Sequence, residues 1–241
     1  MTTPRMPAEV LARMTASDPG RPRLTWYDDE PGPTAGERIE LSARVLANWV
    51  AKAANLLQDD AAAGPGTTVG LDLPAHWRSL YWALATWSVG GTVVVGAAAT
   101  GADVLVTAST AAAAAHGGDA VLVTPAALAR SHPDAAEAPA AVDEARELAT
   151  HGDVFSPMSD PEAGDVALAG AAGDTAYGEV VVARPEWGEA PRVALGGELE
   201  DVLRACLAAW AVDGSVVLVR GPRDADLTAR LTAEGVTTDA R

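Results

Sequence analysis

Apolar and polar residues recur with two different periods along this chain, and the periods predict its first elements. Residues 23–28 and 37–41 flank the acidic, Pro- and Gly-rich stretch 29–36, and the second run alternates polar and apolar residues. Two such runs joined by turn residues predict a β-hairpin. From Ser42, a residue type that caps helices, apolar residues recur at helical spacing to about residue 58, which predicts a helix with one buried face.

Strand and helix patterns then alternate through the middle of the chain. Strands are predicted at 67–73, 92–95, 103–107 and 120–123, and helices at 77–89 and up to about residue 115. These strands are continuous apolar runs, and such strands alternating with helices favour parallel sheets covered on both faces. The predicted fold class is α/β, doubly wound with mostly parallel sheets and an N-terminal β-hairpin.

The second half of the chain carries weaker patterns. Residues 126–150 are weakly helical in pattern, and 151–164, which contains two prolines, is predicted to be a loop. Further strands are predicted at 165–169, 178–183 and 215–219, helices at 197–211 and from Asp224 to Glu234, and a strand beginning at 236–238. The predicted organisation is an arm or short helix (1–20), a first α/β lobe (21–160) and a partial second lobe packed on it (161–241).

Composition limits the class of protein. The 241 residues are 49% hydrophobic and 21% charged, which is typical of a globular protein with a sizeable core. The longest apolar runs are far shorter than the ~20 residues that span a bilayer, so no membrane segment is expected. Residues 1–20 carry Arg5 and Arg13 but no apolar block, which argues against a secretory signal and predicts a cytoplasmic location.

Charge and cysteine usage exclude further classes. The formal net charge of −16 repels phosphate backbones, so no nucleic-acid partner is expected. Cys206 is the only cysteine, which excludes an intrachain disulfide, and its apolar surroundings predict a buried side chain. Lys52 is the only lysine and is predicted to lie on a solvated helix face. This preference for arginine over lysine, with many alanines, is typical of a GC-rich bacterial genome.

Few residue clusters have the spacing of a known catalytic or metal site. His116 with Asp119, and His151 with Asp153, place a histidine near a carboxylate in Gly-containing loops. Metal ligation or general-base chemistry is one interpretation of these pairs, and ordinary surface residues are the favoured one. The chain has no Gly-x-Ser-x-Gly elbow, His-Glu-x-x-His, Walker lysine loop or Gly-x-Gly-x-x-Gly fingerprint. No metal site and no catalytic residue are predicted.

Several short segments occur in the order found in one superfamily. They are Leu24-Thr25-Trp26, Gly64-Pro65-Gly66 with the strand to Leu71, Leu73-Pro74-Ala75-His76, and Ala85-Thr86-Trp87-Ser88-Val89-Gly90-Gly91 with the strand to Val95. In this order they resemble the adenylate-forming superfamily, the AMP-dependent acyl-CoA synthetases and ligases. The resemblance extends over nearly the whole chain but over only about the first half of a full-length member.

The resemblance implies where ATP would bind. Members hold its phosphates with a Ser/Thr- and Gly-rich loop that ends in lysine, and the matching stretch here is 165–179. Gly170, Gly173 and Thr175 remain at this degenerate phosphate-loop position and are the candidate cofactor-binding residues. Asp174 and Glu179 stand where donors are needed, and negative charge there repels phosphate. A strand-to-strand turn is therefore favoured over a working ATP loop, and no cofactor is expected, although ATP or AMP is the one that the resemblance implies.

The same resemblance leads to three functional hypotheses. The family's catalytic lysine lies in a C-terminal domain that is not expected here, and its adenine- and magnesium-binding motif has no counterpart. The first hypothesis is a non-catalytic, acyl-CoA synthetase-like binding or assembly module that forms homo-oligomers or binds a protein partner. The second is one half of a split adenylate-forming enzyme completed by a partner chain. The third is a small-molecule or nucleotide binder at the carboxyl edge of the sheet.

Overall fold

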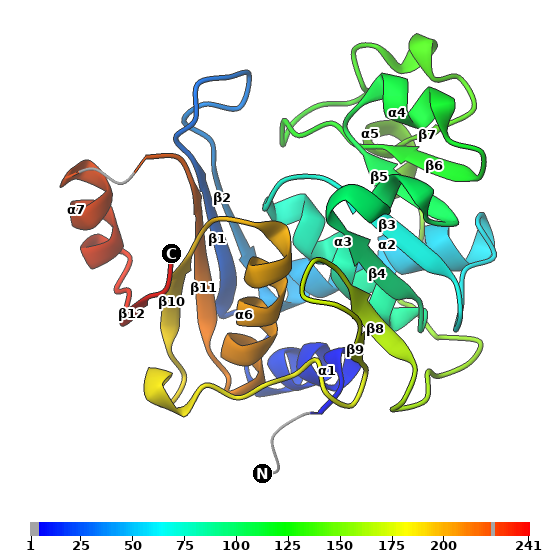
Figure 1. The fold of residues 1–241 in the computed structure, drawn as a ribbon. Helices are drawn as coiled ribbons and strands as arrows, with labels where there is room; N and C mark the ends of the chain where they lie inside the picture. The colour runs from blue at the N-terminus through cyan, green and yellow to red at the C-terminus, as the bar shows by residue number, and fades with distance from the viewer. Residues whose placement is uncertain (1–4, 223–224) are drawn as a thin grey trace.

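The strands form two sheets that lie side by side. In the computed structural model, which describes residues 5–222 and 225–241, one sheet has the order β12-β10-β11-β1-β2 and the other β7-β6-β5-β3-β4-β8-β9. Most neighbouring strands in both are parallel, and helices pack on both faces. Figure 1 shows the five-stranded sheet on the left and the seven-stranded sheet on the right. The predicted doubly wound α/β class is confirmed.

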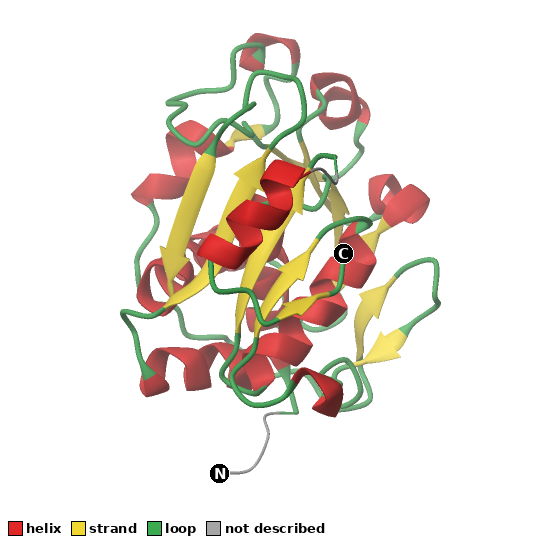
Figure 2. Ribbon diagram, turned by 90° about the vertical axis from the view of Figure 1, so that its left-hand side faces the viewer, coloured by secondary structure: helices red, strands yellow, loops and turns green. Residues whose placement is uncertain are grey.

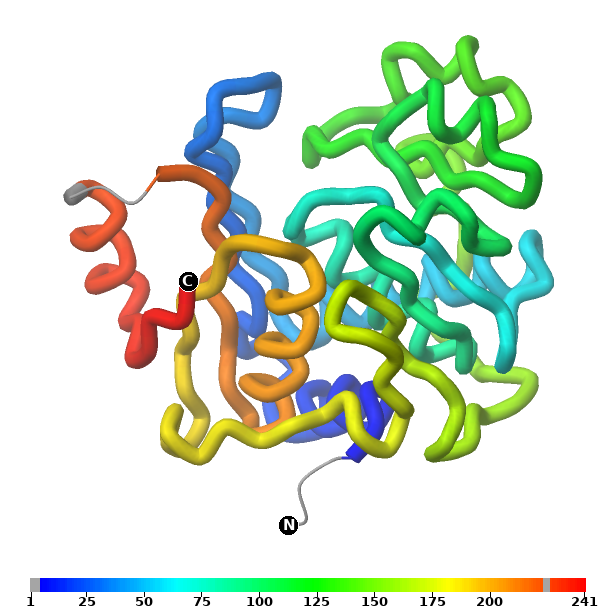
Figure 3. Tube along the Cα trace, viewed as in Figure 1, coloured from blue at the N-terminus to red at the C-terminus, as the bar shows by residue number. Residues whose placement is uncertain are grey.

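The five-stranded sheet joins the beginning of the chain to its last third. Its strands are β1 (Pro22–Asp28), β2 (Arg38–Ser42), β10 (Arg192–Leu195), β11 (Ser215–Arg220) and β12 (Thr238–Asp239). The β1–β2 hairpin is antiparallel, as predicted, and β1 pairs in parallel with β11. Figure 3 shows the blue tube of the hairpin beside the orange tube of β11. Strands from before and after residue 160 thus share one sheet, so the sheets do not coincide with the predicted lobes. Local sequence patterns do not encode which parallel strands pair with each other.

The seven-stranded sheet is built from the middle of the chain. Its strands are β3 (Thr68–Asp72), β4 (Thr92–Val95), β5 (Val104–Thr107), β6 (Asp119–Leu122), β7 (Val142–Asp143), β8 (Val166–Ala169) and β9 (Thr175–Ala176). Only the β8–β9 pair is antiparallel among them. The predicted strands at 67–73, 92–95, 103–107, 120–123 and 165–169 are confirmed to within two residues at each end.

The helices fill the space around and between the sheets, as Figure 2 shows in a view turned by 90°. They are α1 (Pro7–Ser17), α2 (Ala43–Asp59), α3 (Trp77–Ser88), α4 (Thr110–Ala115), α5 (Glu144–Glu147), α6 (Leu199–Ala211) and α7 (Ala225–Ala233), with short 3₁₀ turns η1 (Gly96–Gly101), η2 (Ala135–Glu137), η3 (Leu148–Thr150) and η4 (Pro185–Trp187). Ser42 caps α2 by accepting a hydrogen bond from the Val45 amide, as its position predicts. The predicted cap at Asp224 lies outside the described residues.

Helix α3 lies at the centre of the molecule and is buried on nearly every side. One large apolar core surrounds it and includes residues of both sheets, so the sheets share their core. The tryptophans Trp77, Trp82 and Trp87 of this helix are buried, and Trp49 of α2 packs at the edge of the core.

Two predictions for the irregular parts of the chain are wrong, and one strand was missed. Residues 178–183 form no strand, because the chain turns after the short strand β9 and Tyr177 enters the core. The weakly helical stretch 126–150 is mostly loop, with the 3₁₀ turn η2 near its middle and β7, α5 and η3 near its end. Strand β10, which holds only four residues, was not predicted.

None of the helices in the described part of the chain has the length and apolar character needed to cross a bilayer.

Candidate functional site

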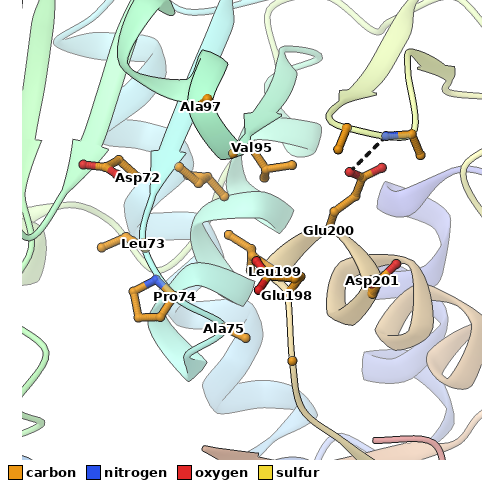
Figure 4. Close-up of a pocket in the computed structure, with 15 residues that line it drawn as sticks. Asp72, Leu73, Pro74, Ala75, Val95, Ala97, Glu198, Leu199, Glu200 and Asp201 are labelled. Atoms are coloured by element: carbon orange, nitrogen blue, oxygen red, sulfur yellow. Dashed lines mark hydrogen bonds between the residues drawn. The ribbon is translucent and has the colours of Figure 1, made fainter.

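A cavity lies between the two sheets, where parallel strands end. It has a volume of about 730 Å³, and its walls come from the carboxyl ends of β3 and β4, the β8–β9 turn and the first turn of α6. Open α/β sheets commonly bind ligands at this edge. Figure 4 shows the lining side chains converging on the space between the sheets, which we call the crevice.

The crevice is acidic. The titratable groups among its lining residues are all carboxylates: Asp72, Glu198, Glu200 and Asp201. Asp72 accepts a hydrogen bond of 2.7 Å from the Thr107 hydroxyl. With carboxylates and no basic side chain in its lining, the crevice repels an anionic group such as a phosphate.

A smaller cavity of about 390 Å³ continues the crevice along the five-stranded sheet and shares Pro74, Ala75, Gly197 and Glu198 with it. Two arginines line this part, and both have acidic partners. Arg220 lies 3.6 Å from Asp28, and Arg241 lies 2.6 Å from Asp239. These ion pairs offset the positive charge that the arginines would present to a ligand.

The three predicted cofactor-binding residues lie in or directly beside the β8–β9 turn, which we call the hairpin loop (residues 170–174). Gly170 follows β8, and Thr175 begins β9. Gly173 has a φ of +91°, a left-handed conformation that glycine adopts without steric cost. Residues 171–174 are exposed to solvent. The loop is therefore a strand-to-strand turn at the mouth of the crevice.

A carboxylate of the chain itself occupies the inner side of the hairpin loop. The Ala172 amide donates to Glu200 Oε2 at 3.4 Å, as the dashed line in Figure 4 shows. Arg204, one turn further along α6, donates to Glu200 Oε1 at 2.9 Å and to the Thr175 hydroxyl at 3.0 Å. The Ala172 amide and the Arg204 guanidinium are thus already bound to an anion, the Glu200 carboxylate.

The charge state of Glu200 follows from these contacts. Partial burial disfavours its charged form, but hydrogen bonds from Arg204 and from the amides of Ala172 and Ala171 outweigh burial. The pKa of the Glu200 carboxyl is therefore lowered from its ordinary value, and the group is anionic at neutral pH. Gly170 makes this arrangement possible, since a β-carbon there would lie 2.3 Å from Glu200 Oε2.

Glu200 and Arg204 were not found from the sequence. They lie about 30 positions beyond the loop, and an acid and a base four residues apart on a helix form a common surface pair. The only available signal was the absence of side-chain donors in the loop, which leaves its amides to be satisfied from elsewhere in the chain.

His76 lies behind the crevice wall formed by Pro74 and Ala75. It is 5% exposed, and its Nδ1 accepts a hydrogen bond from the Arg78 amide at the start of α3. Burial, together with the charges of Arg78 and Arg220, lowers the pKa of His76 to about 3. The ring is neutral at physiological pH and caps a helix, and it carries no charge toward the crevice.

The histidine–carboxylate pairs predicted from the sequence are not brought together as sites. His116 Nε2 lies 3.3 Å from the Asp103 carbonyl oxygen, and His151 Nε2 lies 3.5 Å from Asp60. No group of three or more His, Cys, Asp or Glu side chains able to hold a metal ion occurs among the described residues. Cys206 is buried, as predicted, and burial raises the pKa of its thiol.

The prediction for Lys52 is wrong. Its side chain is only 19% exposed and forms an ion pair with Asp153 at 2.9 Å. Its ammonium also donates to the carbonyl oxygens of His151 and Ala149, at 2.6 and 3.3 Å. Lys52 thus holds the loop that contains His151 and Asp153 against α2. The sequence pattern assigns this face of α2 to solvent, but in the structure the loop covers it.

One curated protein is similar to nearly the whole chain. A TIGR03089 family protein of Mycobacterium tuberculosis (strain ATCC 25618 / H37Rv) is 36% identical over 260 aligned residues, which cover 98% of this chain and 99% of that protein. The chain belongs to the TIGR03089 family. No protein-family model matches this TIGR03089 family member.

Solved structures identify the fold of this TIGR03089 family member as that of the N-terminal domains of adenylate-forming enzymes. An acyl-CoA synthetase of Brucella canis superposes with a TM-score of 0.72 at 17% identity, over 97% of this chain and 46% of that chain. The N-terminal subdomain of Klebsiella oxytoca NpsA in complex with 3-hydroxyanthranilyl-AMSN has a TM-score of 0.65 at 15% identity, over 98% of this chain and 60% of that subdomain.

A third structure extends the same fold similarity. The anthranilate CoA ligase AuaEII in complex with anthranoyl-AMP has a TM-score of 0.69 at 13% identity, over 99% of this chain and 49% of that chain. The TIGR03089 family member thus spans about half the length of these structural relatives. The predicted resemblance to the front part of an adenylate-forming enzyme is confirmed for the fold.

Proposed function

We propose that this chain is a non-catalytic, adenylate-forming-type protein that acts as a binding or assembly module. The observation that carries the proposal is the Glu200 carboxylate in the hairpin loop. A triphosphate needs loop amides and a cation nearby, and here the Ala172 amide and Arg204 bind Glu200 instead. A phosphate at this position would also meet the acidic crevice.

The chemistry of the crevice supports the same proposal. Adenylate formation requires positive groups that stabilise the charge developing at the α-phosphate. Carboxylates alone supply the charge in the crevice lining, and the arginines of the adjoining cavity are paired with Asp28 and Asp239. This distribution of charge suits a ligand without phosphate groups.

An exchange assay tests the proposal directly. We expect no acid-dependent exchange of pyrophosphate into ATP with a mixture of carboxylic acids, and no calorimetric heat with ATP or AMP. Saturable exchange by the purified chain would overturn the proposal. Glu200→Gln identifies the cause: if the carboxylate blocks the loop, inorganic pyrophosphate binds this variant more tightly than the unchanged chain. Asp201→Asn, which removes the charge of the neighbouring crevice carboxylate, is the matched control.

Two alternatives keep specific support. The coverage of about half of each structural relative favours one half of a split adenylate-forming enzyme, completed by a partner chain. The volume and position of the crevice favour a small-molecule binder at the carboxyl edge. Nucleotide binding that requires a second protein supports the first alternative. Binding of a phosphate-free metabolite that Asp72→Asn weakens supports the second.

The proposed module also needs a partner, either a second copy of the chain or another protein. Sedimentation at several protein concentrations distinguishes the two, because the sedimentation coefficient rises with concentration if the chain self-associates and stays that of a monomer if the partner is another protein.

A further inference from the structure

A third cavity lies toward the opposite end of β4 from the crevice. It has a volume of about 380 Å³ and is lined by α1, α2, the end of α3 and residues 153–161. Helix α3 ends at Ser88, just before β4 begins at Thr92, so this cavity lies near the amino ends of the strands. We call it the apolar groove, and it shares no lining residue with the crevice.

The groove is preformed, because polar side chains of α2 hold one wall in place. We call this wall the strap (residues 149–158). Lys52, Asn55 and Gln58 are spaced three residues apart and lie on one face of α2. Asn55 donates to the carbonyl oxygens of Gly152 and Val154, both at 3.0 Å, and Gln58 accepts from the Met158 amide at 3.0 Å. Together with the Lys52 contacts, these bonds fix an otherwise irregular segment.

The opposite wall is fixed as well. Arg23 is fully buried and donates to the Ser17 hydroxyl at the end of α1 and to Asp213 Oδ1, at 2.7 and 2.6 Å. This network ties α1 to the turn between α6 and β11. A ligand that enters the groove therefore meets walls that are already in place, which lowers the entropic cost of binding.

Small and apolar side chains form the interior of the groove. Alanines at positions 8, 12, 47 and 51 leave the space open, and Leu11, Val50, Trp87 and Phe155 supply apolar surface. The polar atoms of the interior are internally satisfied: the Trp87 indole donates to the Ala167 carbonyl, and the hydroxyls of Thr15 and Ser88 donate to carbonyls of their own helices. An apolar ligand can therefore pack against the interior without leaving these polar groups unpaired.

Charge at the rim selects the head group of the ligand. The ionisable side chains among the lining residues are Asp153 and Asp160, both exposed carboxylates. Asp153 is paired with the Lys52 ammonium, which also donates to two strap carbonyls and is not among the lining residues, so Asp160 supplies the remaining charge of the rim. The chain as a whole carries a net charge of −16. An anionic head group would be repelled, and a cationic one attracted.

We infer that the apolar groove binds a small organic cation with an apolar body, such as an alkyl or arylalkyl amine. Its volume of about 380 Å³ falls within the ~300–1,000 Å³ range of small-molecule sites. The apolar body lies against Trp87, Val50 and Leu11, and the cationic head lies at the rim beside Asp160. This site is independent of the function proposed for the crevice.

The test compares two probes with the same ten-carbon chain, used below their micelle concentrations in titration calorimetry. We expect decyltrimethylammonium to bind saturably with one molecule per chain, and decyl sulfate to bind at least about tenfold more weakly. Equal binding of the two probes, or no saturable binding of the cation, would overturn the inference.

Variants locate the site. Ala12→Leu or Ala8→Leu fills the groove from exposed positions of α1, and either should weaken binding of the cation at least about tenfold. Asp160→Asn should weaken it about two- to fivefold and reduce the preference over decyl sulfate. The matched controls are Ala111→Leu on α4 and Asp119→Asn on β6, both at exposed positions far from the groove in the sequence. Equal losses in a control and a groove variant with unchanged unfolding temperatures would overturn the assignment.

Discussion

The hairpin loop and the strap are both irregular segments, each held by side chains of a neighbouring helix, but α6 accepts a hydrogen bond from its loop whereas α2 mainly donates to its loop. In the hairpin loop, Glu200 of α6 accepts from the loop amide of Ala172. In the strap, Lys52 and Asn55 of α2 donate to loop carbonyls. The first arrangement removes donors that an anion would need, and the second leaves an apolar wall facing a groove. A helix can therefore either occupy the amide donors of a loop or hold a loop in place as the wall of a groove.

Among variants that test this comparison, we expect Lys52→Met to lower the free energy of unfolding most. It removes the donor of two hydrogen bonds to carbonyl oxygens and the ion pair with Asp153. Hydrogen bonds to charged groups contribute ~1.5–3 kcal/mol each when well made, so we expect a loss of about 2 kcal/mol from the free energy of unfolding. Urea unfolding measures this loss. Thermolysin should also cleave the freed strap at Phe155 or Met158.

Lys52→Arg is the matched control, because a guanidinium retains the charge and the donors. It should keep most of the stability and the protease resistance. If Lys52→Met is as stable and as resistant as the unchanged chain, the strap is not held by this lysine.

Glu200→Gln should have a smaller effect, about 1 kcal/mol, because the amide side chain keeps an acceptor but loses the charge that Arg204 binds. A loss of this size lowers the unfolding temperature by ~2–4 °C in a chain of this length. Asp201→Asn controls for the loss of a negative charge in the first turn of α6. An equal loss in both variants would attribute the effect to the helix dipole alone.

Gly170→Ala tests the same contact without changing a charge. The added β-carbon would lie 2.3 Å from Glu200 Oε2, so the carboxylate must move. In the Glu200→Ala background this clash is absent, and the two changes should be coupled by at least ~0.5 kcal/mol in a double-mutant cycle. Strict additivity, measured by urea unfolding of all four variants, would show that the carboxylate does not lie against Gly170.

The smallest expected effect is a pH dependence confined to the hairpin loop. The pKa of Glu200 is lowered from the ordinary value of 4.5 in the folded chain. Its stabilising contribution is therefore fully present above about pH 4.5 and is lost as the pH falls through the folded value. The amide resonances of Ala171 and Ala172 should titrate below pH 4.5, whereas that of Met158, which donates to the uncharged Gln58, should not. Titration of Ala172 at or above 4.5 would contradict the lowered pKa.

Most of the fold was predictable, because long periodic segments determine their own secondary structure. The cap at Ser42, the buried helix α3 and strands β3 to β6 follow from capping chemistry and apolar spacing. Strand β10 was missed because its four residues lie between turns and owe their extended form to pairing with β11. The partnership of β1 with β11 was missed for a related reason, since a parallel pair has no turn to mark it.

The site was predictable only in part. The position of the hairpin loop and its lack of side-chain donors could be read from the chain, and Gly170, Gly173 and Thr175 do lie together. The contact with Glu200 depends on how α6 packs against the seven-stranded sheet, which no local pattern specifies. Lys52 shows the same limit, because its helix face becomes half-buried only when the strap covers it.

The pairing of β1 with β11 has a consequence for synthesis on the ribosome. Arg23, at the start of β1, is 187 positions before Trp210, whose indole donates to its carbonyl oxygen. At translation rates of 5–20 residues per second, the first hairpin waits ~10–40 s for its central neighbour. During that interval the edge of β1 that later pairs with β11 has no strand beside it, so the nascent chain exposes an unpaired apolar edge until the sheet closes.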